Sequence, residues 1–177
     1  MTSFEKRNKT TQTMVLGAIL TALVVVLQLA GAFIRFGMFS VSLVLIPIVI
    51  GAAVCGPKIS TWLGVVFSII VLITDAAAFF AISVPGTVFV VLLKGAGCGL
   101  AAGLVYKLLE KRNRYLAIAA AAIICPIVNT GVFLLGCRLF FFETVSAWGA
   151  GLGYANAAAY MFLGLAGFNF LFELLFI

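Results

Sequence analysis

Long apolar runs, separated by short charged stretches, limit most strongly what this chain can fold into. The first run extends from Thr13 to Ala32, and similar runs recur as far as Ile177. A helix that spans the hydrocarbon core of a bilayer needs about 20 mostly apolar residues. Only 9% of the 177 residues are charged, whereas about a quarter are charged in an ordinary soluble domain. Lipid must therefore surround most of this chain.

The apolar runs predict an all-α membrane protein, a compact bundle of six transmembrane helices. The predicted helices cover residues 13–32, 38–54, 60–74, 87–106, 115–137 and 151–177. The short apolar stretch 76–85 closes with the helix-ending pair Pro85-Gly86, so a loop or re-entrant segment is expected there. Residues 1–12 form a polar tail, and residues 13–177 form one transmembrane domain.

The basic residues predict how the helices are oriented in the membrane. An even number of spans puts both termini on one side, together with Lys6, Arg7, Lys9, Lys58, Lys107, Lys111, Arg112 and Arg114. Only Arg35 and Arg138 lie on the other side, and Lys94 falls inside a span. Because cytoplasmic loops carry an excess of Lys and Arg, the tail 1–12 and both termini are predicted to be cytoplasmic.

Several classes of function lack the residues that they require. The sequence has no His and no C-x-x-C pair, so neither a metal site nor an intramembrane metalloprotease is expected. It has no G-x-x-x-x-G-K-[ST] loop, so any ATP hydrolysis must come from partner subunits. The free thiols Cys55, Cys98, Cys125 and Cys137 are expected to be buried and inert. We therefore expect no enzyme and no cofactor.

Polar side chains within the spans indicate a candidate binding site, because such groups are costly in lipid and usually face the interior. Lys94 lies about 10 Å from the outer end of its span, at about 1.5 Å per residue, and Asn129 lies at a similar depth. Lys94 either binds a ligand or snorkels outward or pairs with Asp75. Asn129 either meets the same ligand or joins two helices. Asn169 and Glu173 lie farther inward and are expected to join helices or face a partner.

Other candidate residues lie near the same depth or in the outer loops. Asn129 and Phe133 are one turn apart, and an amide beside an aromatic ring would suit a small polar organic molecule. Asn156 and Tyr160 share a face of the last span, so they are candidates for the same cavity. Arg35 lies in a tight loop, where it either closes over a ligand or remains a solvated surface charge.

Two spans carry small residues at a spacing of four, which lets helices in lipid approach closely. Gly95, Gly99 and Gly103 predict close packing inside the bundle. Ala18 and Ala22 allow two interpretations. They either pack inside the bundle or form a flat external face on which a partner helix docks.

Three segments stand out, which are "AILTA" in the first span, "IPIVIGAAVCGPKISTWLGVVFS" across the second and third, and "PIVNTGVFLLG" in the fifth. Through these segments the chain resembles the substrate-binding S components of energy-coupling factor (ECF) vitamin transporters. The segment from Ile46 to Ser68 is the most specific of these. The similarity extends over nearly the whole chain.

This resemblance implies a subunit of an ABC importer in the bacterial plasma membrane. It would capture a vitamin from outside with high affinity, dock on a transmembrane coupling subunit that carries two cytoplasmic ATPases, and topple to release its cargo. The alanines that contact the coupling subunit in the family correspond to Ala18 and Ala22. The regions that hold ligands in the family contain Arg35, Lys94, Asn129, Thr130, Asn156 and Tyr160 in this chain.

Pantothenate is the favoured vitamin. The segment across the second and third spans resembles the pantothenate-type members, and a carboxylate would give the desolvated Lys94 ammonium a counter-ion. Hydroxyls and an amide in the same ligand would match Asn129 and Thr130. Riboflavin and folate remain alternatives, as does a small secondary transporter or channel that works alone.

Overall fold

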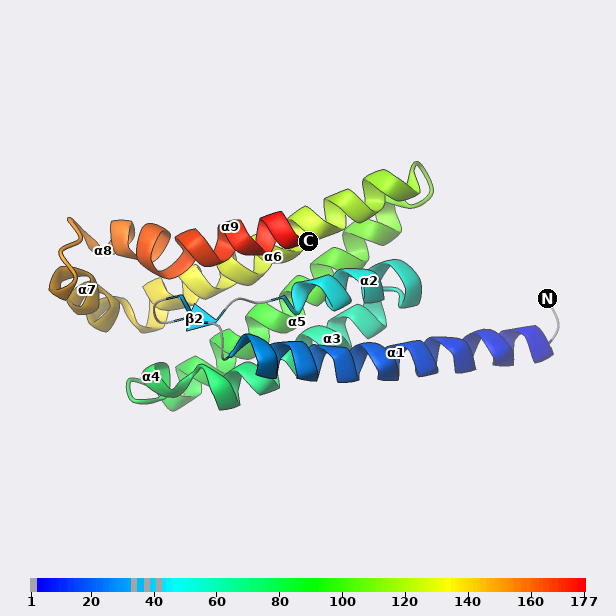
Figure 1. Cartoon of the computed structure of the whole chain (residues 1–177), viewed down its shortest axis with the longest axis horizontal. Helices are drawn as coiled ribbons and strands as arrows, with labels where there is room; N and C mark the ends of the chain where they lie inside the picture. The colour runs from blue at the N-terminus through cyan, green and yellow to red at the C-terminus, as the bar shows by residue number, and fades with distance from the viewer. Residues whose placement is uncertain (1–2, 33–34, 37–38, 41–42) are drawn as a thin grey trace.

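Helices form almost all of this computed structural model (Figure 1). It describes the backbone of residues 3–32, 35–36, 39–40 and 43–177, with the side chains of residues 10–32, 43–167, 170–171 and 173–177. The helices are α1 (Ser3–Gly31), α2 (Leu45–Cys55), α3 (Pro57–Thr74), α4 (Ala77–Phe80), α5 (Val84–Leu109), α6 (Arg114–Phe140), α7 (Phe142–Gly151), α8 (Ala157–Ala159), the π-helix η1 (Tyr160–Gly167) and α9 (Phe168–Phe176). The two-residue strands β1 (Arg35–Phe36) and β2 (Phe39–Ser40) pair antiparallel.

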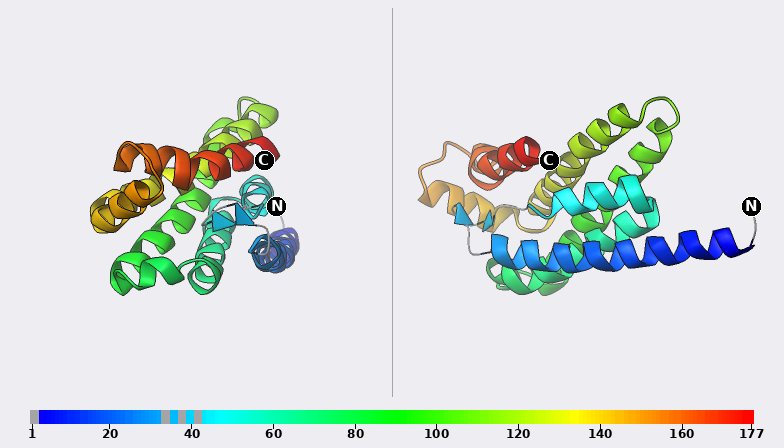
Figure 2. Two further views of the ribbon diagram at one scale, coloured as in Figure 1. Left: turned by 60° about the vertical axis from the view of Figure 1, so that its left-hand side comes forward. Right: turned by 45° about the vertical axis from the view of Figure 1, so that its right-hand side comes forward.

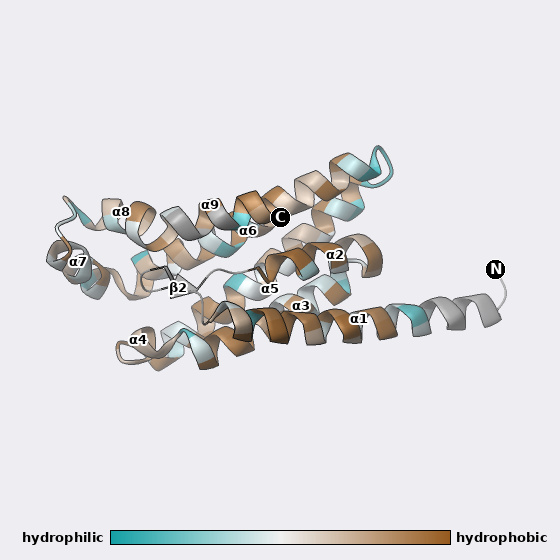
Figure 3. Ribbon diagram, in the orientation of Figure 1, coloured by the Kyte–Doolittle hydropathy of each residue, from teal (hydrophilic) through white to brown (hydrophobic). Residues whose placement is uncertain are grey.

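The chain runs back and forth along the long axis of the molecule. The N-terminus, the α2–α3 turn and the α5–α6 loop lie towards one end, and α4, α7 and the strand pair lie towards the other (Figures 1 and 2). Hydrophobic residues cover most of the helices, and hydrophilic ones gather at the α5–α6 loop (Figure 3). The prediction of a helical fold is thus confirmed for the described residues.

Among the described residues, four helices are long and apolar enough to cross a membrane. They are Thr10–Gly31, Pro57–Thr74, Val84–Leu109 and Arg114–Phe140. The helix α2 and the segment Ala157–Gly167 are apolar but shorter. The number of six spans therefore stays a prediction.

Several helix ends differ from the predicted ones because capping residues move them. The pair Pro85-Gly86, predicted to close a loop, lies in the first turn of α5, where the Ser83 hydroxyl accepts a hydrogen bond from Gly86 N at 3.3 Å. Proline suits the first turn of a helix because N–H groups there have no intrahelical acceptor, so the absence of an N–H loses no hydrogen bond. The last helical run begins at Ala157 rather than at residue 151, because α7 occupies the preceding segment.

Glycines bring α3 and α5 into close contact, as their spacing predicts. A Cβ atom on Gly95 would collide with Ser68, and one on Gly99 would collide with the backbone of Ser60. The Ser60 hydroxyl donates to the carbonyl oxygen of Gly99 at 2.7 Å, and the Ser68 hydroxyl donates to that of Val91 at 2.7 Å. These bonds satisfy buried hydroxyls and join the two helices on which the pocket is built.

Candidate functional site

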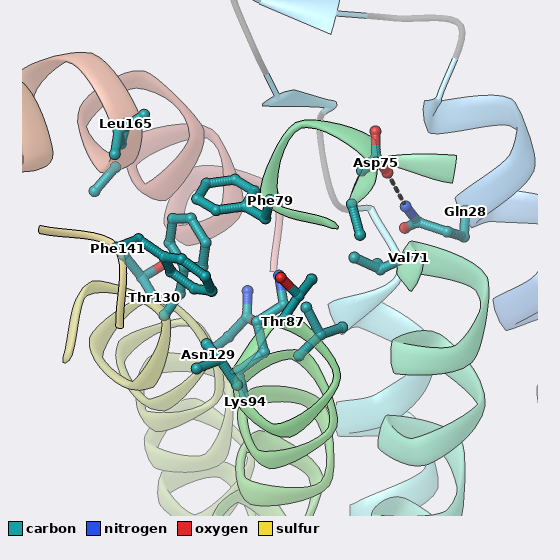
Figure 4. Close-up of a pocket in the computed structure, with 15 residues that line it drawn as sticks. Gln28, Val71, Asp75, Phe79, Thr87, Lys94, Asn129, Thr130, Phe141 and Leu165 are labelled. Atoms are coloured by element: carbon teal, nitrogen blue, oxygen red, sulfur yellow. Dashed lines mark hydrogen bonds between the residues drawn. The ribbon is translucent and has the colours of Figure 1, made fainter. Parts of the chain in front are cut away.

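A pocket lies between α1, α3, α4, α5, α6 and η1 (Figure 4). Its polar lining consists of Gln28, Asp75, Thr87, Lys94, Asn129 and Thr130. The remaining wall is apolar and mostly aliphatic or aromatic. A few converging polar groups in an apolar pocket are typical of a small-molecule site.

Lys94 and Asn129 reach the pocket from neighbouring helices at the same depth (Figure 4). Lys94 lies ten residues after the start of α5 at Val84, which is about 15 Å along the helix. Asn129 lies eleven residues before the end of α6 at Phe140, which is about 16 Å. Both are deeper than predicted, because α5 starts earlier and α6 ends later than the apolar pattern indicates.

The Lys94 ammonium lies between two aromatic rings. Its Nζ atom is 5.6 Å from the centroid of the Phe67 ring and 5.3 Å from that of Phe133. No hydrogen bond or ion pair of Lys94 is found in the described part of the chain. Cation–π contacts contribute about 0.5–2 kcal/mol, which is less than the cost of removing an ammonium from water. The site therefore favours an anionic group beside Lys94.

Asn129 is held from behind by a carboxylate of the last helix. Asn129 is 4% exposed and Glu173 is 2% exposed, and Asn129 Nδ2 donates to Glu173 Oε1 at 3.5 Å. Asn129 Oδ1 has no hydrogen-bond partner among the described residues. Glu173 thus joins two helices, as expected, but it lies against the pocket residue Asn129 rather than farther inward, because the last helical run starts later than predicted.

A second cluster of polar side chains lies where α1 and α3 end. The Gln28 side chain donates from Nε2 to Asp75 Oδ2 at 3.0 Å, and the Thr74 hydroxyl donates to the same oxygen at 2.8 Å. Gln28 Oε1 has no partner among the described residues. These hydrogen bonds place a carboxylate and an amide oxygen at the edge of the pocket away from Lys94 (Figure 4).

Aromatic side chains enclose the same pocket. The Phe79 ring of α4 contacts Phe133, Phe141 and Trp148, with centroid separations of 5.7, 5.2 and 5.8 Å. The pocket leaves about 50 Å³ for the centres of water-sized molecules, and about 10–15 Å³ suffices for one water. It thus accommodates a few waters, and an organic ligand requires the side chains to move apart.

Two predicted ligand residues lie elsewhere. Asn156 is exposed and caps α8, since its Oδ1 accepts from Ala159 N at 2.7 Å. Tyr160 is 2% exposed, and its ring packs between Gly149 and Gly164. Neither residue lines the pocket. Because the helix starts at Ala157, Asn156 serves as its cap and Tyr160 serves as a packing residue. Arg35 belongs to β1, and its side chain lies outside the described residues.

Four predicted residues do line the pocket, and others were missed. The four are Lys94, Asn129, Thr130 and Phe133. Gln28 is an amide in an apolar helix, so the rule that selected Asn129 would also have selected it. Thr87 and Phe79 gave no comparable signal, because a hydroxyl or a ring is ordinary in such a segment.

The two alanines of α1 that are spaced four apart, Ala18 and Ala22, face outward. Ala18 and Ala22 are exposed, whereas Gly17, Leu20 and Val24 are buried towards the bundle. Ala18 and Ala22 are therefore on the surface of this chain, where packing within the bundle does not account for them.

The apolar helices and the interior polar pocket define a class, namely a helical membrane protein that binds a small molecule. The family model "ECF transporter, substrate-specific component" matches residues 12–177. The chain belongs to this family, so it is the substrate-binding subunit of an ECF transporter and not an enzyme. Searches of curated proteins and of solved structures each returned no match.

Proposed function

We propose that this subunit captures a carboxylate-bearing vitamin, with pantothenate as the favoured ligand, and delivers it by docking on an energising module with ATPase subunits. The observation that carries the choice of ligand is Lys94, a cation at mid-membrane depth with no ion pair in the described part of the chain. A ligand carboxylate would supply the missing counter-ion. Family membership supports the role as a substrate-binding subunit.

The order of groups in pantothenate suits the polar groups of the pocket. Its carboxylate would lie beside Lys94, and its amide N–H would donate to Asn129 Oδ1, which has no partner among the described residues. Its hydroxyls would reach the other polar edge and donate to Asp75 and to Gln28 Oε1, and its methyl groups would contact Phe79. Satisfying buried acceptors is worth about 1 kcal/mol each.

Ligand entry requires the aromatic side chains to separate. Phe79 is the obvious moving part, because its helix α4 has four residues and its ring contacts rings from α6 and α7 as well as Phe141. Closure of these rings after entry would exclude water, which strengthens the attraction between Lys94 and a carboxylate.

Titration calorimetry with a panel of vitamins tests the choice of ligand. We expect pantothenate to bind the purified protein, and we expect pantothenol, in which a hydroxymethyl group replaces the carboxylate, to bind at least tenfold more weakly, because it offers Lys94 no anion. Binding of riboflavin or folate in place of pantothenate would assign the subunit to another vitamin. Equal affinity for pantothenate and pantothenol would refute the role of Lys94.

Uptake into proteoliposomes separates the proposed import mechanism from a transporter that works alone. The subunit by itself should bind the vitamin without accumulating it, and accumulation should require the coupling subunit, the ATPases and ATP. ATP-independent uptake by this chain alone would instead support a secondary transporter or channel.

A further inference from the structure

A second hollow lies on the outside of the bundle, between α6 and the start of the last helical run. One wall is a stripe of α6 that consists of Gly131, Leu134, Leu135 and Arg138. The facing wall consists of Ala158, Met161 and Phe162. We call this hollow the α6–η1 groove. It leaves about 320 Å³ for the centres of water-sized molecules, compared with about 50 Å³ in the pocket.

The floor and walls of the α6–η1 groove suit a hydrocarbon chain. Apart from its chain neighbours and the backbone of its own helix, no described atom lies within 4 Å of the position that a Cβ atom on Gly131 would take. Leu135 and Phe162 expose 62% and 64% of their surface, and Arg138 is the one charged residue among the described residues of the lining. Water has few polar partners in such a groove, so an apolar occupant is favoured.

Arg138 adds a cation at the mouth of the groove. Its guanidinium carbon lies 5.3 Å from the centroid of the Phe142 ring, and no ion pair of Arg138 is found among the described residues. It is seven residues from Gly131, about 10 Å along α6, and two residues before the helix ends at Phe140. Because it lies close to the end of a helix long enough to span a membrane, we expect it at the level of the lipid headgroups, where a guanidinium binds phosphate with two parallel hydrogen bonds.

We propose that the α6–η1 groove binds an anionic phospholipid, with one acyl chain between α6 and η1 and the headgroup phosphate on Arg138. Charge complementarity favours this occupant over an apolar helix of a partner, which would cover Arg138 without a counter-ion. The site is separate from the vitamin pocket, because the two share no lining residue. Bound lipid would hold α6 and the last helical run at a constant separation.

Native mass spectrometry of the delipidated full chain tests this site. The probes are phosphatidylglycerol and phosphatidylcholine with identical acyl chains, added in detergent. The wild type should bind phosphatidylglycerol more tightly than phosphatidylcholine, by roughly fivefold for one charge pair. Arg138→Gln should abolish that preference. Gly131→Leu should weaken both lipids, because its side chain would fill the floor of the groove.

Arg114→Gln is the matched control, because Arg114 is an exposed cation at the opposite end of the same helix. It should leave the lipid preference unchanged, and vitamin binding by all three variants should match that of the wild type, which shows that they fold. The proposal is overturned if the wild type shows no preference between the lipids, if Arg138→Gln retains it, if Arg114→Gln loses it, or if Gly131→Leu binds lipid as the wild type does.

Discussion

At the scale of single residues, the pocket depends on Lys94, whose ammonium lies between two aromatic rings and makes no ion pair in the described part of the chain. Lys94→Ala should weaken pantothenate binding by roughly 10- to 100-fold, because a hydrogen bond to a charged group is worth about 1.5–3 kcal/mol. Calorimetry on the purified protein measures this change. Lys107→Ala is the control, since Lys107 is exposed on the same helix, and equal effects of the two variants would contradict the assignment.

Replacing Asn129 by Asp should lower the stability of the fold, although it hardly changes the shape of the side chain. Asn129→Asp would place a second carboxylate about 3.5 Å from that of Glu173, in the interior. Two carboxylates this close repel each other strongly in low dielectric, so the melting temperature should fall by several degrees.

Asn156→Asp provides the comparison for Asn129→Asp, because Asp caps a helix about as well as Asn and Asn156 is an exposed cap. Thermal unfolding in detergent should show no loss for this variant. A similar loss in both variants would mean that the contact between Asn129 and Glu173 has no particular importance for stability.

At the scale of elements, the contact between α3 and α5 has no room for one additional methyl group. Gly99→Ala would direct a Cβ atom into the backbone of Ser60, and forcing atoms into a packed interior costs about 1–3 kcal/mol. The melting temperature should therefore fall. Gly131→Ala should keep or raise it, because that position faces open space and alanine favours a helix over glycine by about 1 kcal/mol. If the two variants melted alike, close packing of α3 on α5 would not be limiting.

The outward face of α1 is the proposed docking surface. Ala18→Trp and Ala22→Trp should abolish co-purification with the coupling subunit, because a large side chain prevents the close approach that small residues allow. Vitamin binding should persist, since both residues are exposed and neither lines the pocket.

Leu16→Trp is the control for this docking surface. Leu16 is exposed near the same level of α1, and at 100° per residue it lies on the opposite flank of the helix. Normal assembly of both alanine variants, or loss of assembly in Leu16→Trp as well, would show that docking uses a different surface.

At the scale of the whole molecule, the charge distribution predicts which end faces the cytoplasm. Lys111 and Glu143 are exposed near opposite ends of α6. In intact cells, an impermeant thiol reagent should label Glu143→Cys and should label Lys111→Cys only after lysis, because the charge distribution predicts a cytoplasmic basic end. The reverse pattern would invert the topology. The native cysteines are buried or partly buried, and the wild type supplies the background.

Much of the site could be predicted where the signal is local. Lys94, Asn129, Thr130 and Phe133 were selected because polar groups and their helical neighbours are informative inside an apolar run, and all line the pocket. The same rule also selected Asn156 and Tyr160, which do not line the pocket. The rule assigns residues to one face of a helix before the start of that helix is known. Moving that start to Ala157 converts Asn156 into a cap and Tyr160 into a packing residue.

By itself, the sequence determined that this chain is a helical membrane protein with a basic end and a polar centre, because hydrophobicity, charge and periodicity act along the chain. Only the tertiary structure decided which polar groups meet. Gln28 and Asp75 are 47 residues apart in the chain, and Asn129 and Glu173 are 44 apart. Such pairs depend on where each helix starts, how it rotates and how closely glycines let it approach its neighbours, and these are properties of packing rather than of any single segment.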